Sequence, residues 1–255
     1  MPMTEHLSDK NLVQLAKQQY ESSQKSTIPT VLVSLPSKGL VYPASSPLRS
    51  GTIEMRYMTA YDEDILTNSS YIRAGVAIDN LLRALIVTNV SIDDLVVGDK
   101  DAMIIAARLH GYGPDYAVVV TEPNTNNKLE RVLNLQDLQF KPFELQSNEN
   151  GEFTFKDSGI DIKFKFLCKR EIESLSVEHA LSDFLRVSIK EIKGTRQQSD
   201  IDNFVRYQMT PGQSKKLRTY ISNNMPGIKL DAEFQGENGG TFTAGFQIGP
   251  DFFWF

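Results

Sequence analysis

Residues 101–135 read DAMIIAARLHGYGPDYAVVVTEPNTNNKLERVLNL, a helix pattern followed directly by a hairpin pattern. Apolar residues recur at helical spacing over 103–109, and Gly111 is expected to end the helix. Two β-prone runs within residues 116–135 flank the turn-forming segment 123–127. A helix joined to a hairpin in this way, without βαβ alternation, favours the α+β class.

Similar patterns recur along the rest of the chain. Asp99 is a candidate cap for the helix just described, and Thr210, followed by Pro211 and Gln213, is a candidate cap for another. Strands are expected over 30–35, 52–58, 152–156, 160–166, 229–234 and 241–248, and helical stripes over 9–21, 78–86 and 180–192. This mixture predicts an α+β fold made of helix groups and several antiparallel hairpins.

Two parts of the chain differ in character. Residues 1–50 combine a short helix pattern with a Pro- and Ser-containing stretch, which predicts an N-terminal helix and an extended arm. Residues 51–255 are expected to form a single α+β domain, and a division into two lobes, 51–166 and 167–255, is left open. With 40 % hydrophobic residues, the chain can bury a substantial core.

Composition argues against several classes of protein. The formal net charge is −5 and neither half of the chain is strongly basic, so no nucleic-acid ligand is expected. The first residues lack a basic segment followed by an apolar run, and no stretch approaches the ~20 apolar residues that cross a bilayer, so no membrane association is expected. Cys168 is the only cysteine, which excludes an internal disulfide.

No pattern of catalytic or metal-binding residues stands out. The acidic residues near Asp62, Asp64 and Asp93 could hold a metal ion or act as acid and base, but charged residues at helix starts are more often cap and dipole partners. We therefore expect no catalytic residue, no metal site and no cofactor. An enzyme that uses these three acids is the alternative, and it requires a deep pocket with two of them close together.

The end of the chain is aromatic. Residues 251–255 read DFFWF, and each ring can bury roughly 150–250 Å². If the segment continues as a strand, alternate rings enter the chain's own core and the others face outward as partner anchors. The arm up to Pro47 poses a similar choice, because it could wrap its own domain or pair with a neighbour's sheet edge. The predicted partner interface comprises Leu35, Pro36, Lys38, Tyr42, Phe252, Phe253, Trp254 and Phe255.

Three segments together resemble a known family: LPSKGLVYP at 35–43, MRYMTAYDEDILTN at 55–68, and the closing FFWF. Their order, with GVAIDNLLRALIV and DKDAMIIAARLHGYG between them, is similar to that of the baseplate hub proteins of T-even-type contractile-tailed bacteriophages. This family includes a hub subunit and a related hub assembly factor. The resemblance covers the chain from about Leu35 to its end.

One departure from the family pattern concerns metal binding. Relatives of this kind often carry CxxC pairs in two hairpins, an arrangement similar to a zinc ribbon. At the corresponding places this chain has Glu122–Thr125 and Gln235–Gly239, without cysteine. The resemblance therefore implies degenerate zinc-ribbon-like hairpins without metal, held by hydrogen bonds and packing. A degenerate zinc-ribbon adaptor that binds nucleic acid is a further alternative, which the mixed charges around 128–131 disfavour.

The resemblance implies a non-enzymatic phage tail protein that acts in baseplate hub assembly. Its expected partners are other tail and baseplate hub proteins, with no nucleic acid, membrane or small-molecule substrate. Its expected location is the host cytoplasm during assembly and, if it is retained, the baseplate of the virion tail. A retained hub component and a transient assembly factor both remain open.

Overall fold

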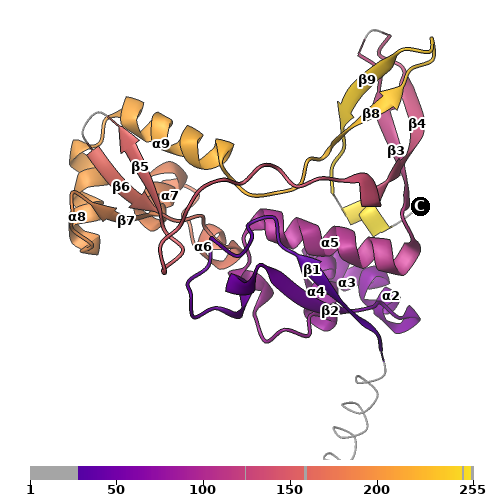
Figure 1. Cartoon of the computed structure of the whole chain (residues 1–255), viewed down its shortest axis with the longest axis horizontal. Coiled ribbons are helices and arrows are strands. Elements are labelled where there is room, and N and C mark those ends of the chain that lie inside the picture. The colour runs from indigo at the N-terminus through magenta and orange to yellow at the C-terminus, as the bar shows by residue number, and fades with distance from the viewer. Residues whose placement is uncertain (1–27, 124, 158–159, 249, 254–255) are drawn as a thin grey trace, which may run out of the picture.

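The computed structural model describes residues 28–123, 125–157, 160–248 and 250–253 (Figure 1). It has three parts: a helical block (residues 30–112), a second lobe (residues 153–223), and a projecting hairpin pair (residues 115–134 with 231–245). Buried apolar residues from all three parts belong to one connected cluster. Since helices and several small antiparallel sheets make up the chain, the α+β prediction is confirmed.

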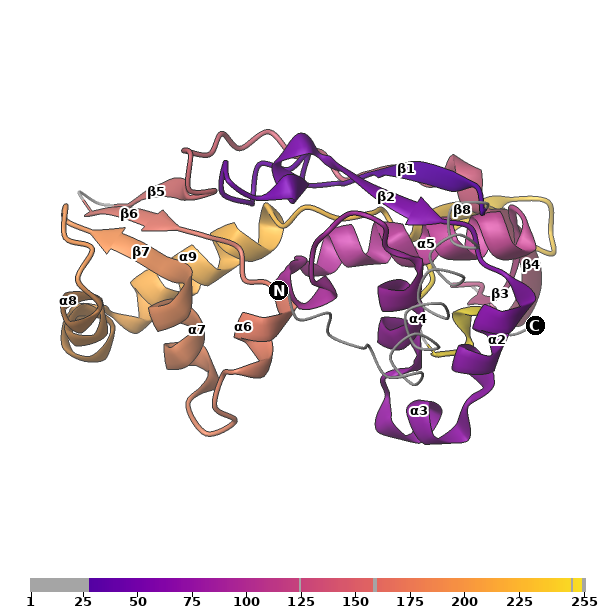
Figure 2. The same cartoon turned by 90° about the horizontal axis from the view of Figure 1, so that it is seen from below.

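The helical block combines a two-stranded sheet with four helices. Strand β1 (Thr30–Ser34) pairs antiparallel with β2 (Thr52–Arg56), so the described part of the arm joins the chain's own sheet. The helices are α2 (Ala60–Thr67), α3 (Ser69–Ala74), α4 (Ala77–Leu85) and α5 (Val97–Tyr112), with 3-10 turns η1 (Pro47–Ser50) and η2 (Ile92–Asp94). Figure 2 shows β1 and β2 on one side of this block and α3 on the other. The helix expected over 9–21 lies outside the described residues.

The second lobe is built around a three-stranded antiparallel sheet in the order β5–β6–β7. Its strands are β5 (Phe153–Asp157), β6 (Ile160–Phe164) and β7 (Ile189–Ile192), and its helices are α6 (Lys169–Glu173), α7 (Ala180–Ser188), α8 (Gln198–Asn203), the π-helical turn η4 (Phe204–Gln208) and α9 (Pro211–Asn223). Because β6 pairs with β7, backbone hydrogen bonds cross the suggested lobe boundary at residue 166. The division into domains stays a prediction.

One predicted element is wrong at its end. The helical stripe expected over 180–192 stops at Ser188, and the next four residues form β7. Ile189 and Ile192 lie opposite Phe164 and Ile162 of β6 and are buried. β-branched side chains fit a pleated, half-buried surface, so pairing with β6 prevails over the helical spacing.

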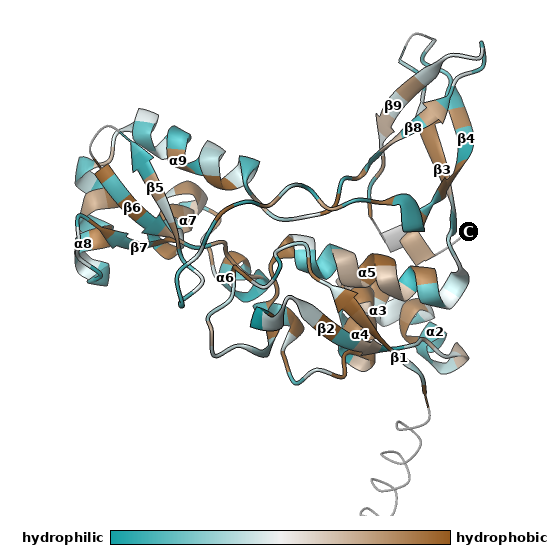
Figure 3. Cartoon of the chain, in the orientation of Figure 1, coloured by the Kyte–Doolittle hydropathy of each residue, from teal (hydrophilic) through white to brown (hydrophobic). Residues whose placement is uncertain are grey.

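The start of α9 agrees with its sequence signal. Thr210 Oγ1 accepts from the Gln213 backbone N–H, Gln213 Oε1 accepts from the Thr210 N–H, and Pro211 occupies the first turn. Only Leu217 and Ile221 of this helix are buried, and Figure 3 shows mostly hydrophilic colour along α9. The helix therefore covers the β5–β6–β7 sheet with a narrow apolar edge.

The hairpin pair projects from the helical block (Figure 1). It consists of β3 (Asp115–Thr121) with β4 (Lys128–Asn134), followed by the turn η3 (Leu135–Asp137), and of β8 (Asp231–Gln235) with β9 (Thr241–Gly245). Alternate residues of each strand point toward the other hairpin. Buried side chains on these facing surfaces are Val118, Val120, Leu129, Leu133 and Phe234. Each hairpin thus supplies the cover that a lone two-stranded sheet lacks.

The two turns implicated by the zinc-ribbon resemblance are linked by hydrogen bonds. Asn127 Nδ2 donates to Glu237 Oε2 at 2.9 Å, and Arg131 donates from Nε and Nη2 to the Gln235 carbonyl at 2.9 and 2.8 Å. A Cβ at Gly236 would lie 2.2 Å from Glu122 Oε1, so glycine permits this approach. Hydrogen bonds from the Asn127 and Arg131 side chains, to a carboxylate and a backbone carbonyl, thus connect the two hairpins.

Two connecting segments run antiparallel between the hairpin pair and the second lobe. Lys141 N–H donates to the Gly227 carbonyl and Lys229 N–H to the Gln139 carbonyl, both at 2.8 Å. The second of these segments crosses the first turn of α5 at Gly98, where a Cβ would lie 2.0 Å from the Pro226 carbonyl oxygen. Close backbone contact at this crossing requires glycine.

We predict that Gly98→Ala lowers the free energy of unfolding by about 1–3 kcal/mol because the added methyl forces Pro226 away from α5. Urea denaturation of the Gly98→Ala chain and the wild type measures the difference in the free energy of unfolding. The control is Gly212→Ala in α9, where the nearest atom to the new Cβ is Thr210 Oγ1 at 4.0 Å. Equal stability of the Gly98→Ala chain and the wild type would contradict the tight crossing.

Candidate interaction site

The described C-terminal rings lie inside the protein. Pro250–Phe253 form the 3-10 turn η5, and Phe252 and Phe253 are each 1 % exposed. Their ring centroids lie 5.7 Å apart at nearly a right angle. The prediction that a strand would alternate inward and outward rings is wrong for these two residues, because the segment is a turn and sends both inward. Trp254 and Phe255 lie outside the described residues.

A buried arginine on α5 holds this turn. Arg108 is 0 % exposed, and its Nε donates to the Phe252 carbonyl at 2.9 Å. Its guanidinium lies 5.2 Å from the ring centroid of Tyr112 and 5.4 Å from that of Tyr116. Burial lowers the pKa of Arg108, while the two tyrosines oppose this shift. Sequence reasoning missed this residue, although its place four residues after Ile104 on an apolar helix face was the available signal.

The loop at 35–43 is fastened to the other end of α5. Asp99 accepts from the Ser37 N–H at 2.9 Å, from Ser37 Oγ at 2.6 Å and from the Tyr42 hydroxyl at 2.6 Å. Burial raises the pKa of Asp99, and burial together with Asp99 raises that of Tyr42. The predicted capping role of Asp99 is wrong: Val96 is the N-cap residue of α5, and the carboxylate is engaged by the loop.

The predicted interface residues therefore differ in exposure. Leu35, Pro36 and Tyr42 are buried in this chain, as are Phe252 and Phe253. Lys38 is exposed, and its Nζ donates to the Phe143 carbonyl at 3.0 Å. Nothing in the structure tests a contact between any of the eight residues and a partner, so that role stays a prediction.

The acids of the alternative enzyme hypothesis are engaged separately. Asp62 is 1 % exposed and receives two hydrogen bonds from Arg56, at 2.6 and 2.7 Å. Asp93 pairs with Arg83 at 3.1 Å and Lys169 at 3.2 Å, whereas Asp64 is exposed. In the described part of the chain no three His, Cys, Asp or Glu side chains are grouped to hold a metal ion, and no helix has the length and hydropathy to span a membrane.

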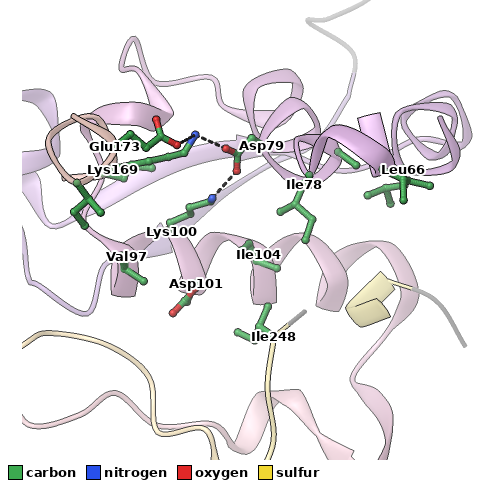
Figure 4. Close-up of a pocket in the computed structure, with 15 residues that line it drawn as sticks. Leu66, Ile78, Asp79, Val97, Lys100, Asp101, Ile104, Lys169, Glu173 and Ile248 are labelled. Carbon is green, nitrogen blue, oxygen red and sulfur yellow. Dashed lines mark hydrogen bonds and ion pairs between the residues drawn. The ribbon is translucent and has the colours of Figure 1, made fainter. Parts of the chain in front are cut away.

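A groove of about 470 Å³ lies beside α5 (Figure 4). We call it the α5 groove. Helices α3, α4, α5 and α6 line it, together with Leu66 at the end of α2 and Ile248 from the segment after β9. Most of its lining side chains are apolar, and Ile72, Val97 and Ile172 are 46 %, 46 % and 40 % exposed. The groove thus gathers apolar surface from segments far apart in the sequence.

An ion-pair network forms one wall of the α5 groove. Asp79 contacts Lys100 Nζ through Oδ1 and Lys169 Nζ through Oδ2, both at 2.5 Å (Figure 4). Lys169 also pairs with Asp93 and Glu173. Burial favours a higher pKa for Asp79, but hydrogen bonds from the two lysines outweigh it and the pKa lies below its ordinary value. The network ties α4 and α5 of the helical block to α6.

Acid is expected to weaken this network. The pKa of Asp79 is lower in the folded than in the unfolded chain, so its ion pairs stabilise the fold above about pH 4, and this contribution is lost as the pH falls through the folded-state pKa. We predict that Asp79→Asn lowers the free energy of unfolding at pH 7 by about 3 kcal/mol and makes its decrease between pH 5 and 2 less steep. Urea denaturation across this pH range measures both effects.

The control for this experiment is Asp161→Asn. Asp161 is 67 % exposed and lies 3.8 Å from Lys156, so its removal is expected to change neither the stability at pH 7 nor the acid response. Identical pH profiles for Asp79→Asn and the wild type would contradict the assigned role of the network.

Comparison with known proteins gives one match. The model of a family described as T4 bacteriophage base plate protein matches residues 28–254. No curated protein and no solved structure matches the chain. The matched range contains the loop fastened to Asp99, the α5 groove and the turn held by Arg108. Because the match covers most of its length, the chain belongs to the T4 bacteriophage base plate protein family.

Proposed function

We propose that this protein acts in assembly of the baseplate hub by binding other tail proteins, without covalent chemistry. Its family gives it a structural role in a T4-type phage tail, where it contacts other phage proteins. The observation that carries the proposal is the α5 groove, in which Ile72, Val97 and Ile172 present apolar side chains to solvent. Exposed apolar surface gathered in a groove is typical of a protein contact site.

Two further contacts are proposed from the sequence. Lys38 is exposed beside the loop at 35–43, and Trp254 and Phe255 follow the buried turn η5. The proposed roles of Leu35, Pro36, Tyr42, Phe252 and Phe253 are indirect, since these side chains hold the loop and the turn in place. Contacts at Lys38 and at the last two residues would add to binding at the groove.

We predict that co-expression with the hub proteins of the same phage yields a complex that co-purifies on a tag placed on either partner. A chain ending after Phe253 should stay folded by circular dichroism but retain less hub protein, because it keeps both buried rings and lacks the last two. A chain ending after Pro250 loses two buried rings and should melt at a lower temperature.

A wild-type chain that elutes alone, together with normal hub assembly in phage lacking it, would rule out the proposed function. Equal capture by the wild type and the chain ending after Phe253 would rule out only the terminal anchor. Mass spectrometry of purified virions separates the two versions of the role: stoichiometric peptides identify a retained component, and their absence identifies a transient factor.

A further inference from the structure

The floor of the α5 groove is one face of a helix. Val97, Asp101 and Ile104 stand at positions i, i+4 and i+7 of α5, so they form a row roughly 10 Å long at 1.5 Å per residue. On one side rise Ile78 of α4 and Glu173 of α6, and on the other lies Ile248 (Figure 4). The described lining of the groove comes from helices and from the segment at Ile248, which lies outside any strand, so it offers no strand edge for sheet extension. The shape fits an added helix.

The lysines that line the groove are paired with acids, but one acid, Asp101, is not paired with any described base. Lys100 and Lys169 are both engaged by Asp79, and Lys169 also by Asp93 and Glu173. Asp101, by contrast, has no hydrogen bond or ion pair through its carboxylate with any residue in the described part of the chain. It is half-buried, and burial raises its pKa although Lys100 and Lys141 lie near enough to oppose this. The unmatched charge in the groove is therefore negative.

We propose that the α5 groove binds an amphipathic helix of another baseplate protein, whose apolar side chains pack on Val97, Ile104 and Ile172 and whose Lys or Arg pairs with Asp101. This inference rests on the proposed function and names the chemistry of the partner at that site. The partner's apolar residues follow i, i+3 or i+4, and i+7 spacing, since they face a helical floor with the same repeat. Its basic residue supplies the direct ion pair that Asp101 makes with no described residue of this chain.

Peptide binding tests the proposal. Overlapping 20-residue peptides that tile the other baseplate proteins encoded by the same phage serve as fluorescent probes against the full chain. We expect the peptides that bind to be amphipathic and to carry Lys or Arg. Val97→Asp should weaken binding at least tenfold, because it places a charge on the apolar floor while remaining favourable in the first turn of a helix. Val177→Asp, at a site 96 % exposed and outside the groove lining, is the matched control.

Charge exchange tests the assigned cation. Asp101→Asn should weaken binding about five- to tenfold, whereas Asp64→Asn, at an exposed acid outside the groove, should not change it. A bound peptide whose Lys is replaced by Glu should lose binding to the wild type and recover it with Asp101→Lys. Recovery requires contact between these two charges, which a general effect on folding would not reproduce.

Several results would overturn the inference. They are an absence of bound peptides, bound peptides without a basic residue, and insensitivity to both Val97→Asp and Asp101→Asn. Binding only by a peptide of residues 1–27 of this chain, or groove-dependent self-association in sedimentation, would assign the groove to another occupant. If the wild type co-purifies with hub proteins and Val97→Asp does so equally well, the inference fails while the proposed function stands.

Discussion

A single helix, α5, holds two segments far apart in the sequence, the loop at 35–43 and the C-terminal turn η5, through two buried ionisable side chains. Asp99 in its first turn receives hydrogen bonds from Ser37 and Tyr42, and Arg108 near its other end donates to the Phe252 carbonyl. An acid near the N-terminus and a base near the C-terminus each suit the helix dipole. A buried charge is costly without partners, so each requires its loop or turn to be in place. The segments near both ends are thereby fixed to one element.

The three segments that carry the family resemblance all make contacts within the chain. The loop at 35–43 packs on the start of α5, and the segment at 55–68 closes on itself through the Arg56–Asp62 pair. Of the closing segment, the described rings Phe253 and Phe252 pack on Tyr112 and Tyr116. All three hold the chain together internally. The proposed contact with other proteins uses surface that these interactions leave open, and the α5 groove is such a surface. Since α6 belongs to the second lobe, an occupant of the groove would touch both the lobe and the helical block.

Sequence periodicity predicted much of the fold. The hairpins followed from alternating β-branched runs around turn residues, and the start of α9 followed from Thr210, Pro211 and Gln213, since these signals are local. The end of α7 could not be predicted in this way because pairing with β6 decides it. The inward packing of both Phe252 and Phe253 depends on the turn η5, and the aromatic sequence around it does not predict a turn.

The candidate site was beyond sequence reasoning for a similar reason. The α5 groove takes residues from Leu66 to Ile248, and no single segment supplies enough of them to form a pattern. The pairing of Asp79 with Lys100 and Lys169 likewise spans three helices. Sequence reasoning did identify the aromatic terminus as a segment that must be covered, but the cover of the described rings is intramolecular. The acids were expected to be helix-cap and dipole partners. Asp62 fits this expectation, since it accepts from the Thr59 N–H at the start of α2, whereas Asp93 also pairs with Lys169 of a distant segment.

Hydrogen exchange followed by mass spectrometry on Arg108→Met tests the role of α5 most directly. Methionine keeps much of the buried volume and removes the donors that hold the C-terminal turn. We predict a joint loss of protection in residues 250–253, in β8 and β9, and in the second half of α5, with β5–β7 and α9 unchanged. Loss confined to the helical turn around residue 108, with residues 250–253 still protected, would contradict the claim that α5 holds the C-terminal turn η5.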